Sequence, residues 1–482
     1  MNSLIIWFAV ALLPLQTSDP TALLRAGRFE DALDVVDQEL KVHPRDFRLL
    51  AIRGIALMSL GNEPGALSAY RGALAISPEY LPALQGVAQI EYKSADKAAL
   101  GHLNQLIRLH NSDLIAHAMR AELFARAADC TRAVPDFEAA MPVVRQQRES
   151  LRHYGVCLVK SGRVSDAKLV FSELQASDPS DARAAYALAV LELQAKECTE
   201  ALATLAGLGG DAQALALRSE AYEGLGRTPE AIESLRNAIV AAPLREDLYT
   251  QFAQLCFTYK SYQAGIDVIN AGLTQLPKSA ELFVARGVLF VQQGNYASAD
   301  KDFATAELLN PREPSSADAA VLALIQANRL NEAETDVEAK LRQHPNDPQL
   351  SYFLADVLDR KGAQPGTPEF RRSLNLARKA ITLRPDFALA HDLLARLYQE
   401  NGSEDLAVTE SYAALKYDAD DETALYRLLR ILKSRHASGD ESALADLTSR
   451  WQQARAKQRA AEQRESSFRI TTQAEEKATA VP

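Results

Sequence analysis

The sequence predicts an all-α protein in which helix hairpins stack into an α-solenoid. Prolines recur at intervals of 34 residues, most clearly in the series Pro243, Pro277, Pro311 and Pro345. Between them, apolar residues lie three and four positions apart, which is the spacing of one helix face. Period-two runs of β-branched residues, which are typical of strands, are absent from the sequence. A fixed period of this length indicates a repeat architecture.

The repeating unit is clearest in residues 47–80. Its first helix carries Leu50 and Gly54 on one face, and its second helix carries Ala66 and Tyr70. Small residues return in phase along the chain at two positions of the unit. The eighth position holds Gly54, Ala88, Ala121, Gly155, Ala189, Ser219, Ala253, Gly287, Ala355 and Ala395. The twentieth holds Ala32, Ala66, Ala133, Ala167, Ala201, Ala231, Gly265, Ala299, Ala333 and Ala407.

This pattern resembles the tetratricopeptide repeat, and the resemblance covers almost the whole chain after Asp19. It implies a right-handed superhelix of about 12 helix hairpins. Two helices can cross closely only where Gly, Ala or Ser stands at the crossing. One hairpin cannot bury both of its faces, so neighbouring hairpins must stack.

Residues 1–18 are predicted to be a signal peptide. Residues 4–13 read LIIWFAVALL and are followed by Pro14. Such a run is too short to span a bilayer but is typical of a signal-peptide core. We therefore expect an exported bacterial protein, periplasmic or secreted. The alternative is a buried first helix in a cytoplasmic protein.

The remaining chain divides by the phase of the repeat. Leu208 to Asp211 shorten the sixth repeat, and a six-residue insertion near residues 361–370 lengthens the eleventh. The expected segments are repeats 1–6 over 19–211, repeats 7–12 over 212–421, C-terminal capping helices over 422–466 and a disordered tail over 467–482.

Composition and motifs argue against catalysis and nucleic-acid binding. The 482 residues carry a net charge of −10, whereas broad binding to phosphates needs a strongly basic surface. Metalloprotease, hydrolase and nucleotide-binding motifs are absent from the sequence, and we expect no enzyme, metal or cofactor. The four cysteines form no metal-ligand pair. Cys130 and Cys157 come within bridging range if the protein is exported, and the alternative is four buried thiols.

In the resembled family, partners bind along the concave groove lined by the first helix of each repeat. Read onto this chain, the inner positions include an apolar stretch with Val291 and Ile325. The residues selected as partner-binding candidates are Gln89, Tyr92, Arg152, Tyr186, Phe257, Val288, Tyr352 and Arg396. No repeat combines Lys at the fifth position with Asn at the ninth, so a clamp for chaperone carboxyl termini is disfavoured.

The sequence thus predicts a non-enzymatic scaffold that binds a peptide or partner protein, in an envelope or export assembly by analogy of fold. The alternative is a targeting or regulatory arm of an enzyme complex whose catalytic activity lies on another chain. We expect no nucleic-acid partner and no membrane span, and the sequence does not fix the oligomeric state.

Overall fold

A computed structural model describes residues 19–310, 314–435 and 441–471. Within these ranges the chain forms 27 α-helices and one short 3-10 helix, with no β-strand. The all-α repeat fold predicted from the sequence is confirmed. The predicted signal peptide lies outside the described residues. The helices form two compact units, which are separated in the sequence between Leu208 and Gly209.

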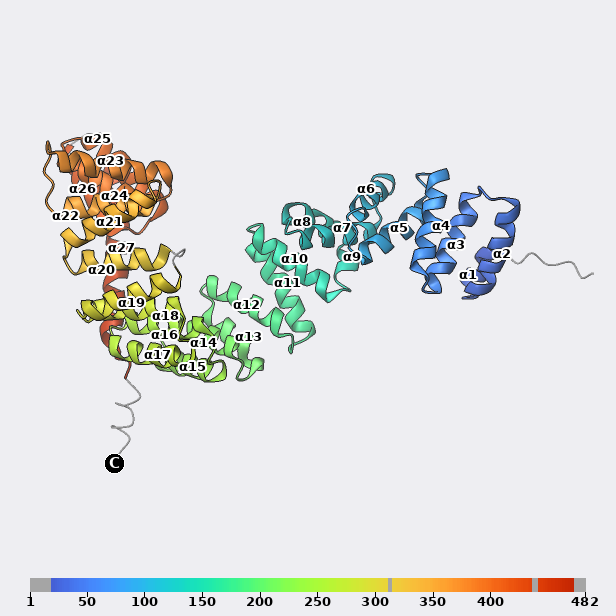
Figure 1. The fold of residues 1–482 in the computed structure, drawn as a ribbon, viewed down its shortest axis with the longest axis horizontal. Coiled ribbons are helices and arrows are strands. Elements are labelled where there is room, and N and C mark those ends of the chain that lie inside the picture. Colours follow the sequence, from blue (N-terminus) through green and yellow to red (C-terminus); the bar gives the residue numbers. More distant parts are fainter. Residues whose placement is uncertain (1–18, 311–313, 436–440, 472–482) are drawn as a thin grey trace, which may run out of the picture. The chain divides into compact units, whose positions relative to one another are not determined.

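Unit 1 is a series of helix hairpins, each packed against the next (Figure 1). Its helices are α1 (Pro20–Arg25), α2 (Phe29–Val42), α3 (Phe47–Ser59), α4 (Glu63–Ile76), α5 (Leu81–Lys93), α6 (Ala99–Leu109), α7 (Leu114–Arg126), α8 (Cys130–Ala139), α9 (Met141–Val144), α10 (Arg148–Lys160), α11 (Val164–Ser177), α12 (Ala182–Gln194), α13 (Cys198–Leu205) and the 3-10 helix η1 (Ala206–Leu208). Asp19 caps α1, since its carboxylate accepts a hydrogen bond from the Thr21 amide at 3.0 Å.

Unit 2 continues the same hairpin order and ends in a long helix. Its helices are α14 (Ala212–Gly224), α15 (Thr228–Ala241), α16 (Glu246–Thr258), α17 (Tyr262–Gln275), α18 (Ala280–Gln292), α19 (Tyr296–Leu309), α20 (Pro314–Gln326), α21 (Leu330–Gln343), α22 (Pro348–Arg360), α23 (Pro368–Leu383), α24 (Ala388–Glu400), α25 (Glu404–Tyr417), α26 (Glu422–Arg435) and α27 (Glu441–Ser467).

Aromatic rings fill the crossings where the small residues stand. Tyr70 is only 3% exposed, and its ring lies between Gly54 of its own hairpin and Gly86 of the next. A Cβ atom would lie 2.4 Å from the ring at Gly54 and 2.3 Å from it at Gly86, which no real Cβ tolerates. Burial also raises the pKa of Tyr70 to about 12. Unit 2 repeats the arrangement, with a Cβ at Gly287 lying 2.6 Å from the ring of Phe303.

The alanines at the twentieth position are the counterpart on the second helix of each hairpin. None of the following has any exposed surface: Ala32, Ala66, Ala133, Ala167, Ala201, Ala231, Ala299, Ala333 and Ala407. The in-phase small residues in the sequence therefore mark contacts at which two helices pack most closely.

The insertion in the eleventh repeat forms the turn between α22 and α23. The helices end at Arg360 and begin again at Pro368, so the last residues of the predicted loop are helical. Thr367 caps α23, because its hydroxyl accepts a hydrogen bond from the Phe370 amide at 3.2 Å. Phe370 itself is buried in the core of this hairpin.

Cys130 at the start of α8 and Cys157 late in α10 form a disulfide, with their Cα atoms 4.8 Å apart. Cys198 and Cys256 are free and buried. Of the two alternatives open from the sequence, the structure thus has the bridge for one pair and buried thiols for the other. The bridge joins the second helix of one repeat to the first helix of the next.

The C-terminal tail differs from expectation. The sequence predicts disorder from residue 467, because the segment is polar. In the structure, residues 468–471 instead pack against unit 2, and Ile470 is only 3% exposed. The rest of the predicted tail, residues 472–482, lies outside the described residues.

Gly86→Ala should lower the free energy of unfolding by about 1–3 kcal/mol, because its methyl group overlaps the confined ring of Tyr70. Gly101→Ala is the matched control. It lies within helix α6, and no heavy atom stands within 4 Å of the point that its Cβ would occupy, so it should be neutral or stabilise by up to about 1 kcal/mol. Urea denaturation measures both. Equal effects of the two substitutions would contradict the close crossing.

The disulfide predicts the thiol count of the denatured, unreduced protein. Labelling should find two free thiols, on Cys198 and Cys256, in protein prepared from an oxidising compartment. Replacing both Cys130 and Cys157 by Ala should lower the free energy of unfolding by about 2–4 kcal/mol, since the bridge restricts the unfolded chain. Four labelled cysteines would show that the bridge does not form.

Candidate partner-binding face

The first helices of successive hairpins form a continuous surface in each unit, here called the first-helix face. In unit 1 α3 contacts α5, α5 contacts α7, and α7 contacts α10. In unit 2 α16 contacts α18, α18 contacts α20, and α20 contacts α22. All of the candidate residues selected from the sequence lie on first helices of their hairpins, namely α5, α10, α12, α16, α18, α22 and α24.

Gln89 and Tyr92 lie on α5, where Gln89 is exposed and Tyr92 is partly buried. Arg126 of α7 stacks on Tyr92, with its guanidinium carbon 5.0 Å from the ring centroid. Its Nη2 also donates a hydrogen bond to the Tyr92 hydroxyl at 3.1 Å. The pair therefore presents one fixed aromatic and cationic surface across two consecutive repeats.

Three exposed valines also lie on the first-helix face of unit 1. They were not among the candidates selected from the sequence. Val156 and Val159 on α10 and Val190 on α12 keep 41%, 37% and 37% of their surface exposed. Tyr186, also on α12, is partly exposed. The valines occupy the ninth and twelfth positions of their repeats, so the positions that selected Gln89 and Tyr92 would have found them.

Arg152 is held in ion pairs with residues of its own chain. Its side chain is 14% exposed, its Nη2 donates to Asp181 Oδ2 at 2.8 Å, and its Nη1 lies 2.5 Å from Glu149. Arg148 donates to the same Asp181 carboxylate at 2.9 Å. A partner that used the charge of Arg152 would have to break these contacts, so we assign this side chain to joining the two repeats.

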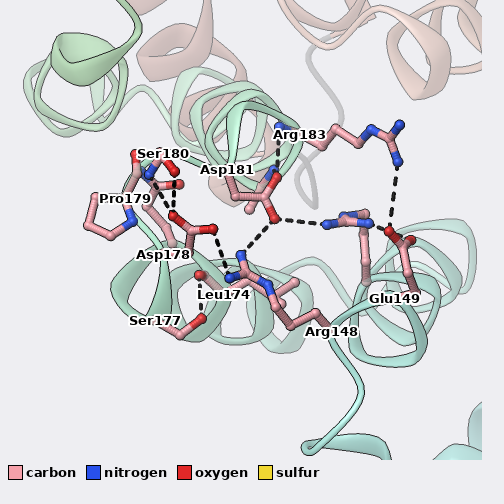
Figure 2. Close-up of polar contacts among 12 residues, drawn as sticks. Arg148, Glu149, Leu174, Ser177, Asp178, Pro179, Ser180, Asp181 and Arg183 are labelled. Carbon is pink, nitrogen blue, oxygen red and sulfur yellow. Dashed lines mark hydrogen bonds and ion pairs between the residues drawn. The ribbon is translucent and has the colours of Figure 1, made fainter.

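The neighbouring charges complete a balanced cluster (Figure 2). Arg148 also donates to Asp178 at 2.9 Å, and Arg183 lies 3.8 Å from Glu149. Three arginines thus face three carboxylates. Hydrogen bonding from Arg152 lowers the pKa of Glu149. Burial alone would raise the pKa of Asp181, but the hydrogen bonds from Arg152, the Ala184 amide and Arg148 hold it below its ordinary value.

The contact between Arg152 and Asp181 has counterparts in other repeats. In each case a side chain at the fifth position of a first helix approaches the carboxylate that caps the next first helix. Gln85 donates to Asp113 in this way at 2.9 Å. In repeat ten the fifth position is Asp318, and burial together with the nearby Asp347 raises the pKa of Asp318 to about 6. Here two carboxylates replace a complementary pair.

In unit 2, the Tyr352 side chain of α22 is largely buried. Its ring centroid lies 5.1 Å from that of Phe387, and burial raises its pKa to about 12. Arg396 of α24 pairs with Asp359 and lies 3.4 Å from Asp356. Both candidates therefore stabilise contacts between repeats, in the same way as Arg152.

The apolar candidates of unit 2 divide by exposure. Phe257 is 37% exposed, with its ring centroid 6.3 Å from that of Tyr262. Val288 is partly buried against the core. The expectation that Val291 and Ile325 line the groove is wrong, because they are 7% and 6% exposed and belong to core clusters.

The described part of the chain offers no cluster of His, Cys, Asp or Glu that could hold a metal ion. Among its helices, none is both long and apolar enough to cross a membrane. The first-helix face therefore offers a partner apolar and aromatic side chains. Charged side chains on it such as Arg152 and Arg396 are already paired within the chain.

The sequence pattern of one family matches the chain in three segments, residues 21–80, 155–214 and 319–366. That family is the tetratricopeptide repeat. The matched segments cover parts of both units and include α12 and the C-terminal half of α10, which carry the exposed valines. No curated protein matches the chain.

Several solved structures containing similar helical arrays resemble this chain. The crystal structure of yeast Tom70 has 16% identity and a TM-score of 0.43, over 91% of this chain and 95% of that one. A tetratricopeptide repeat protein from Parabacteroides merdae has 17% identity and a TM-score of 0.41, over 60% and 99%. The Naa15/Naa10 structure bound to HypK-THB has 14% identity and a TM-score of 0.37, over 93% and 76%.

Asp318→Asn should stabilise the protein at pH 7, by an amount on the order of 1 kcal/mol once solvent screening is allowed for. The folded pKa of about 6 exceeds the ordinary 3.8, so wild-type stability falls as pH rises through this interval. The advantage of the variant should therefore shrink between pH 6 and pH 4 and vanish below that. Urea midpoints across pH measure it, with the exposed Asp386→Asn as control. An advantage independent of pH would contradict the assignment.

Proposed function

We propose that the protein is a non-enzymatic scaffold whose first-helix face in unit 1 binds a peptide or helix of a partner protein. The observation that carries this is the exposure of Val156, Val159 and Val190 in the row of first-helix positions that also holds the Tyr92–Arg126 pair. Aromatic and arginine side chains are the residues that most often dominate binding energy at interfaces. The tetratricopeptide repeats supply the rigid array on which such a row can be held.

The partner segment that fits this face is apolar on one side. The nearby charges of the Arg152 cluster are balanced within the chain, so they favour neither a strongly acidic nor a strongly basic ligand. An amphipathic helix or an extended segment with alternating apolar residues would bury the valines and leave its polar side in water.

We further propose that the protein is exported and acts in an envelope or export assembly. The apolar run over residues 4–13 supports export, and so does the Cys130–Cys157 bridge, since stable disulfides are typical of oxidising compartments. N-terminal sequencing of the protein purified from its host tests this. A chain that begins after residue 13 is expected, and a mature chain that retains residues 4–13 would contradict export.

Photo-cross-linking in the native host tests the binding face. A benzophenone amino acid at position 156 or 190 should give discrete cross-linked products. The same probe at Leu169 is the control, because this residue of the second helix α11 is 71% exposed but lies off the first-helix face. Equal products at 156 and 169, or none at 156, would contradict the proposal.

Substitution then measures the strength of the contact. Val156→Glu should weaken binding of the cross-linked partner at least about tenfold, because a charge would be buried against an apolar surface. Leu169→Glu should leave affinity unchanged. If the partner is an enzyme and is present in fixed stoichiometry, the scaffold is the targeting arm of that enzyme.

A further inference from the structure

Helix α27 extends well beyond the part of it that packs. Leu447 and Ala454 are buried in the cluster that α27 shares with α25 and α26. From Arg455 to Gln463, by contrast, every side chain is exposed. At 1.5 Å per residue, the 14 residues that follow Ala454, up to Phe468, span about 20 Å. The second half of α27 is therefore a strut that carries the chain back across unit 2 (Figure 1).

The strut ends on the opening repeats of unit 2. After α27 ends at Ser467, residues 468–471 have no helical structure. The Phe468 ring stands edge-on to Tyr259, with centroids 6.1 Å apart. Ile470 is buried in the cluster that contains Ile232 of α15 and Phe252 of α16. These contacts join parts of the chain that are more than 200 residues apart.

Backbone groups of the segment are bound as well. The Ile470 amide donates to Ser261 Oγ at 2.8 Å, and the Thr471 carbonyl accepts from Arg236 Nη2 at 3.1 Å. Ser261 is only 7% exposed. Main-chain hydrogen bonds combined with pockets for alternate side chains are how proteins recognise extended peptides.

The surface that receives the segment is held in place independently. The Tyr259 hydroxyl donates to Glu223 Oε1 at 2.6 Å and lies 2.8 Å from Thr228 Oγ1. The Arg236 guanidinium stacks on Phe252 at 5.8 Å. The receiving side chains are thus oriented by unit 2 itself.

We propose that Ile232, Arg236, Tyr259 and Ser261 form a peptide-binding site that the chain's own residues 468–471 occupy. The site takes an extended segment with an aromatic residue two positions before an aliphatic one. The residues of this site belong to unit 2, whereas the function proposed above uses the first-helix face of unit 1. The proposed site therefore goes beyond that function. The segment makes few contacts with the site. Its covalent link through α27 keeps it close and accounts for much of the time that it is bound. A partner segment with the same chemistry therefore competes for the site.

A labelled peptide tests the site in the full-length chain. The probe is fluorescein-SFRITTQ, the sequence of residues 467–473. A tether of this kind gives an effective concentration near the millimolar range, so wild-type protein should bind the probe at least about tenfold more weakly than Phe468→Ala/Ile470→Asp. The exposed Arg459→Ala on the strut is the control and should bind like wild type. Fluorescence anisotropy measures all three.

Two further comparisons identify the surface. In the Phe468→Ala/Ile470→Asp chain, adding Arg236→Ala and Ser261→Ala should weaken probe binding at least about fivefold, because both backbone contacts are lost. The peptide SSRSTTQ, which lacks the aromatic and aliphatic residues, should not bind. Equal probe affinity in wild type and the released variant, or equal binding of the two peptides, would overturn the proposal.

Hydrogen exchange and light scattering keep the proposal testable if the double variant does not fold. The Ile470 amide should be protected in wild type and should exchange at least several-fold faster in Ser261→Ala. An amide that exchanges at the unprotected rate in wild type would overturn the site. Light scattering should show a monomer. A dimer that dissociates in Ser261→Ala would place the segment on a second copy and overturn occupancy within one chain.

Discussion

The fold depends on one steric constraint: where two helices cross, one of them must present no side chain larger than a methyl group. Tyr70 shows why. Its ring fills the space between two glycines of consecutive hairpins, so one side chain fixes both the crossing within a hairpin and the stacking of the next. The fully buried alanines at the twentieth position repeat the constraint on the second helices. Because each hairpin is built in this way, exposed side chains recur at fixed positions along the first-helix face.

The polar contacts stabilise the array as well. In them, charged side chains pair across neighbouring repeats and are not left available to a partner. Arg152 and Arg396 illustrate this pairing, since each is paired with carboxylates of its own chain. Asp318 is the exception, where two acids meet and the pKa rises. What remains open for a partner is mainly apolar, as at Val156 and Val190. The C-terminal segment departs from nearest-neighbour order, because it crosses unit 2 to reach α15 and the N-cap of α17.

The hairpins could be read from the sequence because their signal is local and periodic: the positions of Gly54 and Ala66 hold small residues in most repeats, for one steric reason. Their partners across repeats were harder to identify. Asp181 is one of 63 acidic residues, and only its spacing of 29 residues from Arg152 distinguishes it. Phe468 and Ile470 stand in a polar tail, and nothing local shows that they meet Tyr259 and Ser261. The bridge between Cys130 and Cys157 likewise depends on how two helices are oriented.

Residue-resolved hydrogen exchange on the Ala66→Leu variant tests the central claim most directly. If hairpins are stabilised by their neighbours through close crossings, the larger side chain should lower protection in α3, α4 and α5 and leave α16 to α19 of unit 2 as in wild type. Equal loss of protection in both units would show one cooperative core instead of an array. Unchanged protection around α4 would show that the crossing has room for leucine, and the account of the fold would fail.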